Sequence, residues 1–138
     1  MVSQVWLRTA EADSFASLMN KLTKGGFPLK PEDADIAGIA IAGPIENGTT
    51  STPPLIPWRI DISETQKDFG IKRIFLVNDF IAQAYACMSP VGKKAQTVLA
   101  GEAVRDATIA VIGAGTGLGK AFLAPDGKGN YSALPSEG

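Results

Sequence analysis

The sequence of 138 residues contains no histidine and a single cysteine, Cys87. Without histidine, neither a typical zinc site nor a histidine-based catalytic triad can be assembled within the chain. One cysteine excludes an internal disulfide and suits a reducing compartment, and its apolar neighbours predict a buried thiol rather than a nucleophile. Any proton transfer by this chain must therefore use a carboxylate.

The sequence also lacks an excess of charge of either sign. Thirteen Lys and Arg residues stand against 14 Asp and Glu residues, so the formal net charge is -1. This balance gives no indication of a nucleic-acid partner or an anionic membrane surface. We see no signal peptide or apolar run of membrane length, and we expect a cytoplasmic protein. The length suits one ordinary domain or two small lobes.

The most informative stretch is 109–123, where four glycines alternate with other residues between two apolar runs. These are Gly113, Gly115, Gly117 and Gly119. Glycines allow positive φ and close approach of the backbone to another molecule. Successive N–H groups in such a turn form an anion-binding nest, and the Thr116 hydroxyl adds a donor. We predict a strand, a glycine turn with a phosphate site and a returning strand; a hairpin without a ligand is the alternative.

Two other glycine loops do not fit this stretch. A Walker loop needs Ser or Thr after its lysine, but Lys120 is followed by Ala121. The dinucleotide fingerprint needs a third glycine at a position that here holds Leu118 or Lys120. The short apolar run 121–124, closed by a Pro-Asp-Gly turn, favours a returning strand over a helix.

The first half of the chain predicts alternating elements. Residues 5–7 predict a brief strand, and Asp13 is the expected N-cap of an amphipathic helix that Gly25 ends. Residues 35–43 place small residues between isoleucines, which is typical of a strand buried on both faces. An Asn-Gly pair and several prolines within 45–57 predict a turn and a surface loop.

A short helix over 64–69 is predicted from a capping box. Ser63 is its expected N-cap, and Gln66 is expected to reach back toward it. Asp61 and Glu64 have the spacing of a carboxylate pair, but the electrostatics of a helix start explains them better than acid–base catalysis.

The second informative stretch is 74–80, where strand-type residues run directly into Asn78 and Asp79. In an open α/β sheet, ligands bind at the carboxyl ends of the strands, which makes Asp79 the best candidate base. A helix follows, and capping of its N-terminus explains the two residues equally well. The Ser-Pro-Val-Gly run at 89–92 breaks that helix and predicts a lobe boundary.

Together these residues resemble the bacterial-type glucokinases. The motifs that carry the resemblance are Leu-Val-Asn-Asp-Phe at 76–80, Ile-Gly-Ala-Gly-Thr-Gly-Leu-Gly at 112–119 and Leu-Pro-Ser-Glu-Gly at 134–138. Residues 40–45 and Trp58 match the same pattern, so the resemblance covers nearly the whole chain. It implies an α/β, actin-like ATPase (ribonuclease-H-like) fold, with a mixed sheet and flanking helices, in which ATP and a hexose bind between two lobes.

The resemblance also implies roles for single residues. Asp79 would take the proton from the 6-hydroxyl of glucose. The substrate-binding residues would be Asn78, Glu137 and Thr52. The second phosphate loop would include Gly113, Gly115, Thr116 and Gly117, and Mg²⁺ would come with ATP. This agrees with phosphoryl transfer, which depends mainly on positioning, charge stabilisation and one base near the acceptor hydroxyl.

The sequence departs from the family pattern at both ends. The Asp-x-Gly-Gly-Thr-Asn phosphate loop of the family has no counterpart, and the chain stops where the family continues into a Gly-His pair. We therefore expect an incomplete fold, with 1–89 as a partial small lobe and 90–138 as the start of the larger lobe. Such a chain is expected to have little activity and open sheet edges, which favour a homodimer or other self-association. Thr52 is followed by Pro53 where the family has Thr-Asn.

Two other interpretations stay open. In the first interpretation, the chain is an inactive fragment. In the second it is a non-enzymatic sugar-binding protein of the same fold, which keeps Asn78, Asp79 and Glu137 without turnover. Glucose binding without nucleotide binding would indicate the second.

Overall fold

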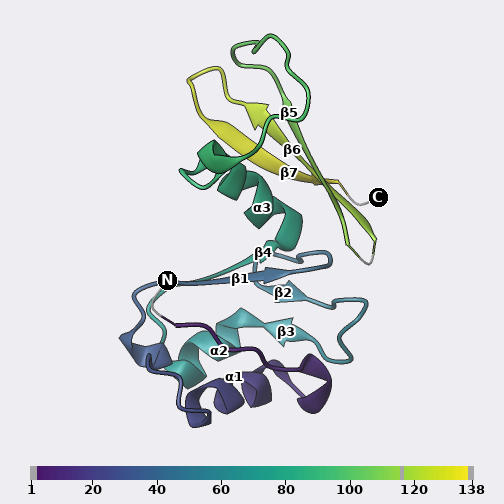
Figure 1. Ribbon diagram of the computed structural model, residues 1–138. Helices are drawn as coiled ribbons and strands as arrows, with labels where there is room; N and C mark the ends of the chain where they lie inside the picture. The colour runs from purple at the N-terminus through teal and green to yellow at the C-terminus, as the bar shows by residue number, and fades with distance from the viewer. Residues whose placement is uncertain (1–2, 116, 137–138) are drawn as a thin grey trace. The chain divides into compact units, whose positions relative to one another are not determined.

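The computed structural model describes residues 3–115 and 117–136. Its chain divides into two compact units, Met1–Val77 and Asn78–Gly138 (Figure 1). This division falls one helix before the lobe boundary expected from the sequence, because α3 (Asp79–Met88) packs on the strands of the second unit. The predicted lobes, 1–89 and 90–138, stay a prediction.

The first unit combines short helices with two small sheets. Its elements are η1 (Thr9–Glu11), α1 (Phe15–Lys24), η2 (Pro31–Asp33), β1 (Ala37–Ile41), β2 (Thr50–Ser51), β3 (Ile60–Asp61), α2 (Ile62–Phe69) and most of β4 (Ile74–Asn78). In these sheets β1 pairs with β4, and β2 pairs with β3 in antiparallel orientation.

The core of the first unit is aliphatic with an aromatic border. Its buried side chains are Ile41, Ile60, Ile62 and Leu76. Phe15 and Trp58 pack against this cluster, with their ring centroids 6.3 Å apart. The Nε1–H group of Trp58 donates to the carbonyl of Ala12 at 3.0 Å. Phe15 of α1 therefore joins the helix to the core by apolar contact, and the indole of Trp58 adds one polar contact with the segment that precedes the helix.

The start of α1 corrects the predicted cap. Ser14 is the N-cap, because its Oγ accepts a hydrogen bond from the N–H of Ser17 at 3.1 Å. Asp13 instead accepts a hydrogen bond from the Ser14 hydroxyl at 3.2 Å. Both residue types cap helices well, so the sequence alone does not choose between neighbours. The predicted end of this helix at Gly25 is confirmed.

The start of α2 also differs from its prediction. Asp61 is the N-cap, with its Oδ1 accepting from the N–H of Ser63 at 3.0 Å, so the predicted Ser63 cap is wrong. Gln66 does not reach back but donates to a carbonyl beyond the helix. The helix starts earlier because Ile62, 3% exposed, belongs to the core. Its predicted end at Gly70 is confirmed, with a left-handed φ of 64°.

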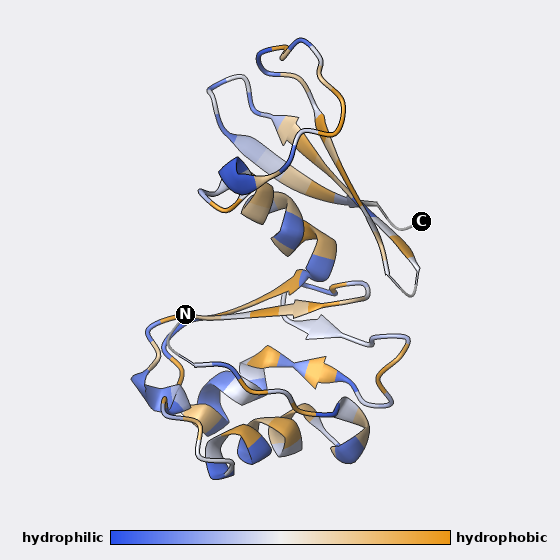
Figure 2. Ribbon diagram, in the orientation of Figure 1, coloured by the Kyte–Doolittle hydropathy of each residue, from blue (hydrophilic) through white to orange (hydrophobic). Residues whose placement is uncertain are grey.

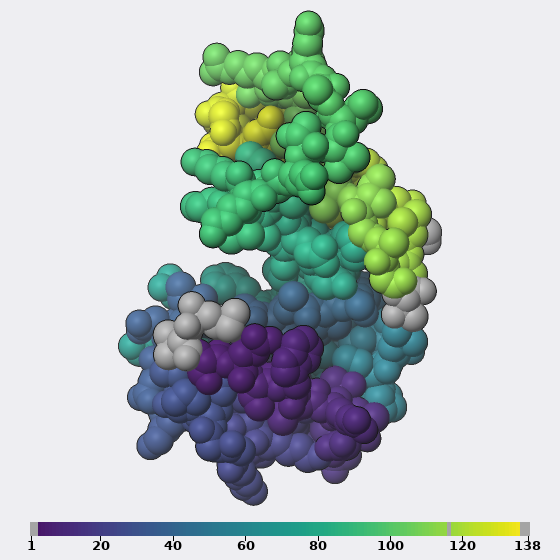
Figure 3. Space-filling model, viewed as in Figure 1, coloured from purple at the N-terminus to yellow at the C-terminus, as the bar shows by residue number. Residues whose placement is uncertain are grey.

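The predicted strand at 5–7 is wrong. Residues 3–8 form no regular structure, and Trp6 is 86% exposed. A strand requires a partner for its N–H and C=O groups, and no strand in the described part of the chain pairs with this segment. In Figure 3 the purple segment near the N-terminus lies on the surface.

Strand β1 is buried on one face only. Ile39 and Ile41 turn toward the core, whereas Gly38 and Ala40 are exposed, so the predicted burial on both faces is wrong. The sheet has two strands in the described chain, and Phe75 of β4 is 53% exposed. Both strands are largely apolar (Figure 2), so this unit leaves part of an apolar sheet uncovered.

The predicted turn after β1 is confirmed. Asn47 and Gly48 both have positive φ, 51° and 71°, and Glu46 forms a bridge with Thr50 across them. The proline-containing segment 52–59 contains no strand.

The second unit packs one helix on an antiparallel sheet. Its elements are α3, η3 (Gly92–Lys94), β5 (Ile109–Ala114), β6 (Leu118–Pro125) and β7 (Tyr131–Ser136), in the sheet order β5-β6-β7. The predicted strand, glycine turn and returning strand over 109–123 are confirmed. The break of the helix at 89–92 is confirmed too, because α3 ends at Met88.

The core of this second unit is small. Ala84 of α3 is buried against Ala121 and Leu123 of β6. Cys87 lies in the last turn of α3 and is exposed, so the predicted buried thiol is wrong. The sheet buries the face of α3 that carries Ala84 and leaves Cys87 exposed, although its neighbours in sequence are apolar.

Among the described residues, we find no helix with the length and apolar character of a membrane span.

Candidate functional site

Asn78 stands where β4 ends and α3 begins. Its Oδ1 accepts hydrogen bonds from the N–H groups of Phe80 at 2.9 Å and Ile81 at 3.3 Å. A helix start leaves four backbone N–H groups without partners inside the helix, and Asn78 satisfies two of them. The capping that the sequence suggested is therefore present, and it fixes the orientation of this side chain.

Asp79 is the first residue of α3 and is half-buried. Its Oδ1 accepts from the N–H of Phe80 at 3.0 Å. Within the part of the chain that the structure describes, its Oδ2 has no hydrogen-bond partner. Asp79 thus combines one anchored oxygen with one that can accept a proton.

Gly115 and Gly117 belong to the tip of the β5–β6 hairpin, beyond the last strand pair, Ala114 and Leu118. The N–H of Gly115 donates to the carbonyl of Gly117 at 2.9 Å, so this amide is engaged within the turn. The N–H of Gly117 has no acceptor among the described residues. Thr116, predicted to add a donor, lies outside the described residues. The complete nest of amides predicted from the sequence stays a prediction.

The ring of Phe80 lies against the cross-strand pair Gly113 and Gly119. A Cβ on Gly119 would lie 1.8 Å from Cε2 of Phe80, and one on Gly113 would lie 2.8 Å from its Cζ. Packing therefore explains both glycines, while a phosphate contact of Gly113 stays a prediction. The sequence analysis assigned no role to Phe80; the available signal was its place directly after Asn78 and Asp79.

The remaining predicted residues are distributed unevenly. Thr52 belongs to the first unit, where it is exposed after β2. Glu137 lies outside the described residues, as Thr116 does. The second unit thus brings together Asn78, Asp79 and the glycine hairpin through Phe80.

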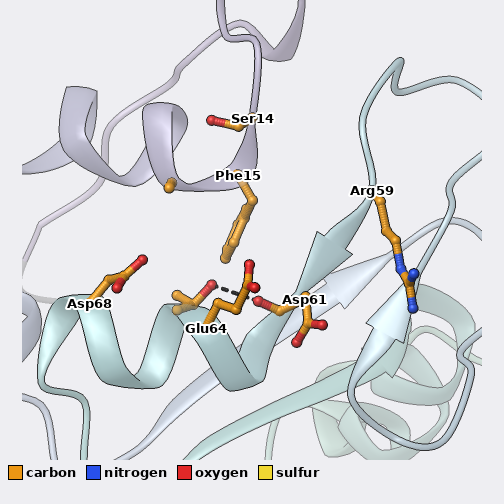
Figure 4. Close-up of a pocket in the computed structure, with 8 residues that line it drawn as sticks. Ser14, Phe15, Arg59, Asp61, Glu64 and Asp68 are labelled. Carbon is orange, nitrogen blue, oxygen red and sulfur yellow. Dashed lines mark hydrogen bonds between the residues drawn. The ribbon is translucent and has the colours of Figure 1, made fainter.

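None of the predicted site residues lines the pocket of about 290 Å³ in the first unit (Figure 4). The residues that line it are Ser14, Phe15, Ala16, Arg59, Asp61, Glu64, Thr65 and Asp68. Hydrogen bonds from the Ser63 hydroxyl and then its N–H hold the pKa of Asp61 below its usual value. Carboxylates at a helix start stabilise that helix, so we assign this pocket no ligand.

Comparison with known proteins gives consistent matches. The family model of glucokinase matches residues 1–138. The glucokinase of Trichormus variabilis is 39% identical over 117 residues, which cover 85% of this chain and 33% of the relative. The glucokinase of Photorhabdus laumondii is 40% identical over 102 residues, covering 74% of this chain and 31% of the relative. The chain spans about a third of the length of these relatives.

Comparison of the structure with solved structures indicates the same family. The crystal structure of a glucokinase from an Antarctic psychrotroph matches with a TM-score of 0.71 at 30% identity, covering 96% of this chain and 39% of that one. The chain is therefore a mixed α/β structure that corresponds to part of the actin-like ATPase fold, as the sequence predicted. With a family match along its whole length and this fold, the chain belongs to the glucokinase family.

Proposed function

We propose that residues 1–138 contribute the catalytic base and one phosphate-binding turn to an enzyme that transfers the γ-phosphoryl group of ATP to the 6-hydroxyl of glucose. Membership of the glucokinase family supports the reaction. The observation that carries the proposal is the geometry of Asp79, whose carboxylate is anchored through one oxygen at a helix start while the other oxygen is available.

In the proposed reaction, Asp79 accepts the proton of the sugar hydroxyl. The hydroxyl oxygen forms its bond to the γ-phosphorus, the bond from that phosphorus to the bridging oxygen of ADP breaks, and the proton passes to Oδ2 of Asp79. Positioning and charge stabilisation supply most of the catalysis in such reactions, with the base acting on the acceptor. Asn78, held by two backbone N–H groups, is oriented in advance to bind a sugar hydroxyl. Glu137 and Thr52 are the further sugar ligands proposed from the family pattern.

The tip of the hairpin fits the approach of a phosphate. The atom closest to a Cβ on Gly115 would lie 4.0 Å away, and a Cβ on Gly117 would meet no described atom within 4 Å. Uncovered backbone of this kind can contact phosphate oxygens closely. We assign Gly113, Gly115, Thr116 and Gly117 to this phosphate loop. Mg²⁺ would be bound mainly by the nucleotide phosphates and would neutralise their charge.

The test uses the product of the complete reading frame that encodes residues 1–138. We expect glucose-dependent ADP release in a coupled assay, and Asp79→Asn is expected to lower kcat by about 10²–10⁴-fold with little change in the KM for glucose. Asp106→Asn is the matched control, because Asp106 is an exposed aspartate of the same unit with a positive φ that Asn tolerates. Full activity of Asp79→Asn would refute the assigned base.

Calorimetry separates the enzyme from a non-enzymatic sugar-binding protein. Heat of binding with glucose, no heat with ATP and no ADP release would favour the binding protein. Sedimentation of the same protein tests the homodimer that open sheet edges favour. We propose a cytoplasmic location, which fits a substrate and a phosphoryl donor of this kind.

A further inference from the structure

Phe80 connects the proposed catalytic residues to the glycine hairpin. Its backbone N–H is shared by Oδ1 of Asn78 at 2.9 Å and Oδ1 of Asp79 at 3.0 Å. Its ring lies on Gly113 and Gly119, which face each other across β5 and β6. One residue therefore contacts the base through its main chain and the strands of the phosphate turn through its side chain.

The ring has little freedom to leave this position. It also packs against the buried cluster formed by Ala84, Ala121 and Leu123. A ring held between a bare pair of glycines and a close-packed cluster occupies one well-defined place, because protein interiors leave few voids. Aromatic side chains that cover glycines in a sheet also support the weakened strands.

We propose that Phe80 is a positioning residue, which fixes the carboxylate of Asp79 relative to the strand ends that carry Gly115 and Gly117. This inference rests on the function proposed above. The start of α3 and the strand ends that carry the turn are separate segments of the second unit, and Phe80 joins them through its contacts with Gly113 and Gly119. For efficient transfer, the sugar hydroxyl and the γ-phosphate must be aligned within a fraction of an ångström. A small shift of the Phe80 contact therefore lowers the rate of phosphoryl transfer more than it weakens the binding of either substrate.

The test is the kinetics of Phe80→Leu in the product of the complete reading frame. We expect kcat to fall about 10–100-fold, while the KM values for glucose and ATP change less than about threefold. Phe122→Leu is the matched control, because Phe122 lies on the opposite face of β6 from the cluster that Phe80 joins. An unchanged kcat in Phe80→Leu would overturn the inference.

A second variant keeps the ring but displaces it. Gly119→Ala places a methyl group where the ring lies, so it is expected to lower kcat as Phe80→Leu does. Gly101→Ala is its control, because a Cβ there meets no atom within 4 Å. If Gly119→Ala and Phe80→Leu only lower the melting temperature and leave kcat intact, Phe80 is purely structural and the inference fails.

The two proposals fail in different ways. If Asp79→Asn keeps full activity, or if the protein releases no ADP with glucose, the proposed function is wrong and the positioning role falls with it. If Asp79→Asn is inactive while Phe80→Leu keeps its kcat, only the positioning role is wrong. Nuclear magnetic resonance of the 138-residue chain adds a readout without turnover: Gly119→Ala should shift the amide resonances of Phe80 and Ile81, and unchanged resonances would contradict the connection.

Discussion

Alanine at the two glycines under Phe80 should destabilise the second unit by unequal amounts. A Cβ at residue 119 falls about 1.6 Å short of the 3.4 Å at which ordinary contact begins, and it meets three ring atoms closer than 2.5 Å. At residue 113 the closest ring atom is 2.8 Å away. Forced overpacking costs about 1–3 kcal/mol. We expect about 3 kcal/mol for Gly119→Ala and about 1 kcal/mol for Gly113→Ala.

The measurement must report on the second unit alone, because the chain divides into two units that need not unfold together. Native-state hydrogen exchange of the buried Leu123 amide in β6 provides such a probe. A loss of about 3 kcal/mol corresponds to about a 100-fold loss of protection in Gly119→Ala. Gly101→Ala should leave the protection unchanged.

A double-mutant cycle decides whether the ring is the cause. In a Phe80→Ala background the obstructing ring is absent, so Gly119→Ala should cost less than about 1 kcal/mol. An equal cost in both backgrounds would show that the backbone of β6, and not Phe80, requires glycine. That result would refute the packing explanation.

Three further predictions concern the same unit. Tyr85→Phe removes the hydroxyl that accepts the N–H of Ala133 at 3.1 Å, so the Ala133 amide should exchange faster, with a stability loss of about 0.5–1 kcal/mol; unchanged exchange would contradict it. The side-chain hydrogen bond of Asn130 lowers the pKa of Asp126 below 3.8. The ionised carboxylate of Asp126 therefore contributes its full stabilisation above that value, and this contribution is lost as the pH falls through the lowered pKa. The urea midpoint of unfolding should drop on acidification, and it should drop less in Asp126→Asn. Gly115→Ala should leave stability within about 0.5 kcal/mol but weaken ATP binding in titration calorimetry; unchanged affinity would exclude a phosphate contact there.

The sequence predicted those parts of the fold that local chemistry determines. Alternating glycines between apolar runs led directly to the hairpin over 109–123, and the Asn-Gly pair at 47–48 led to its turn. Helix ends followed from Gly25 and Gly70. In each case, a short stretch of neighbouring residues is sufficient to predict the local structure.

Other features depended on contacts that sequence patterns do not contain. A strand at 5–7 would need a pairing partner, and Trp6 has none in the described chain. Ser14 and Asp13 are equally good caps, and burial of Ile62 moved the start of α2. The position of Asp79 at a strand end was predictable, whereas the place of the Phe80 ring on two distant glycines was not, because it depends on tertiary packing.

The packing position of the Phe80 ring also constrains how this sequence can change over evolutionary time. Because the ring fills the space above residues 113 and 119, a bulkier residue at 119 is tolerable only after the side chain at 80 has become smaller. Substitutions at these sites should therefore arise as coupled pairs in a fixed order, through an intermediate that carries a void rather than a clash.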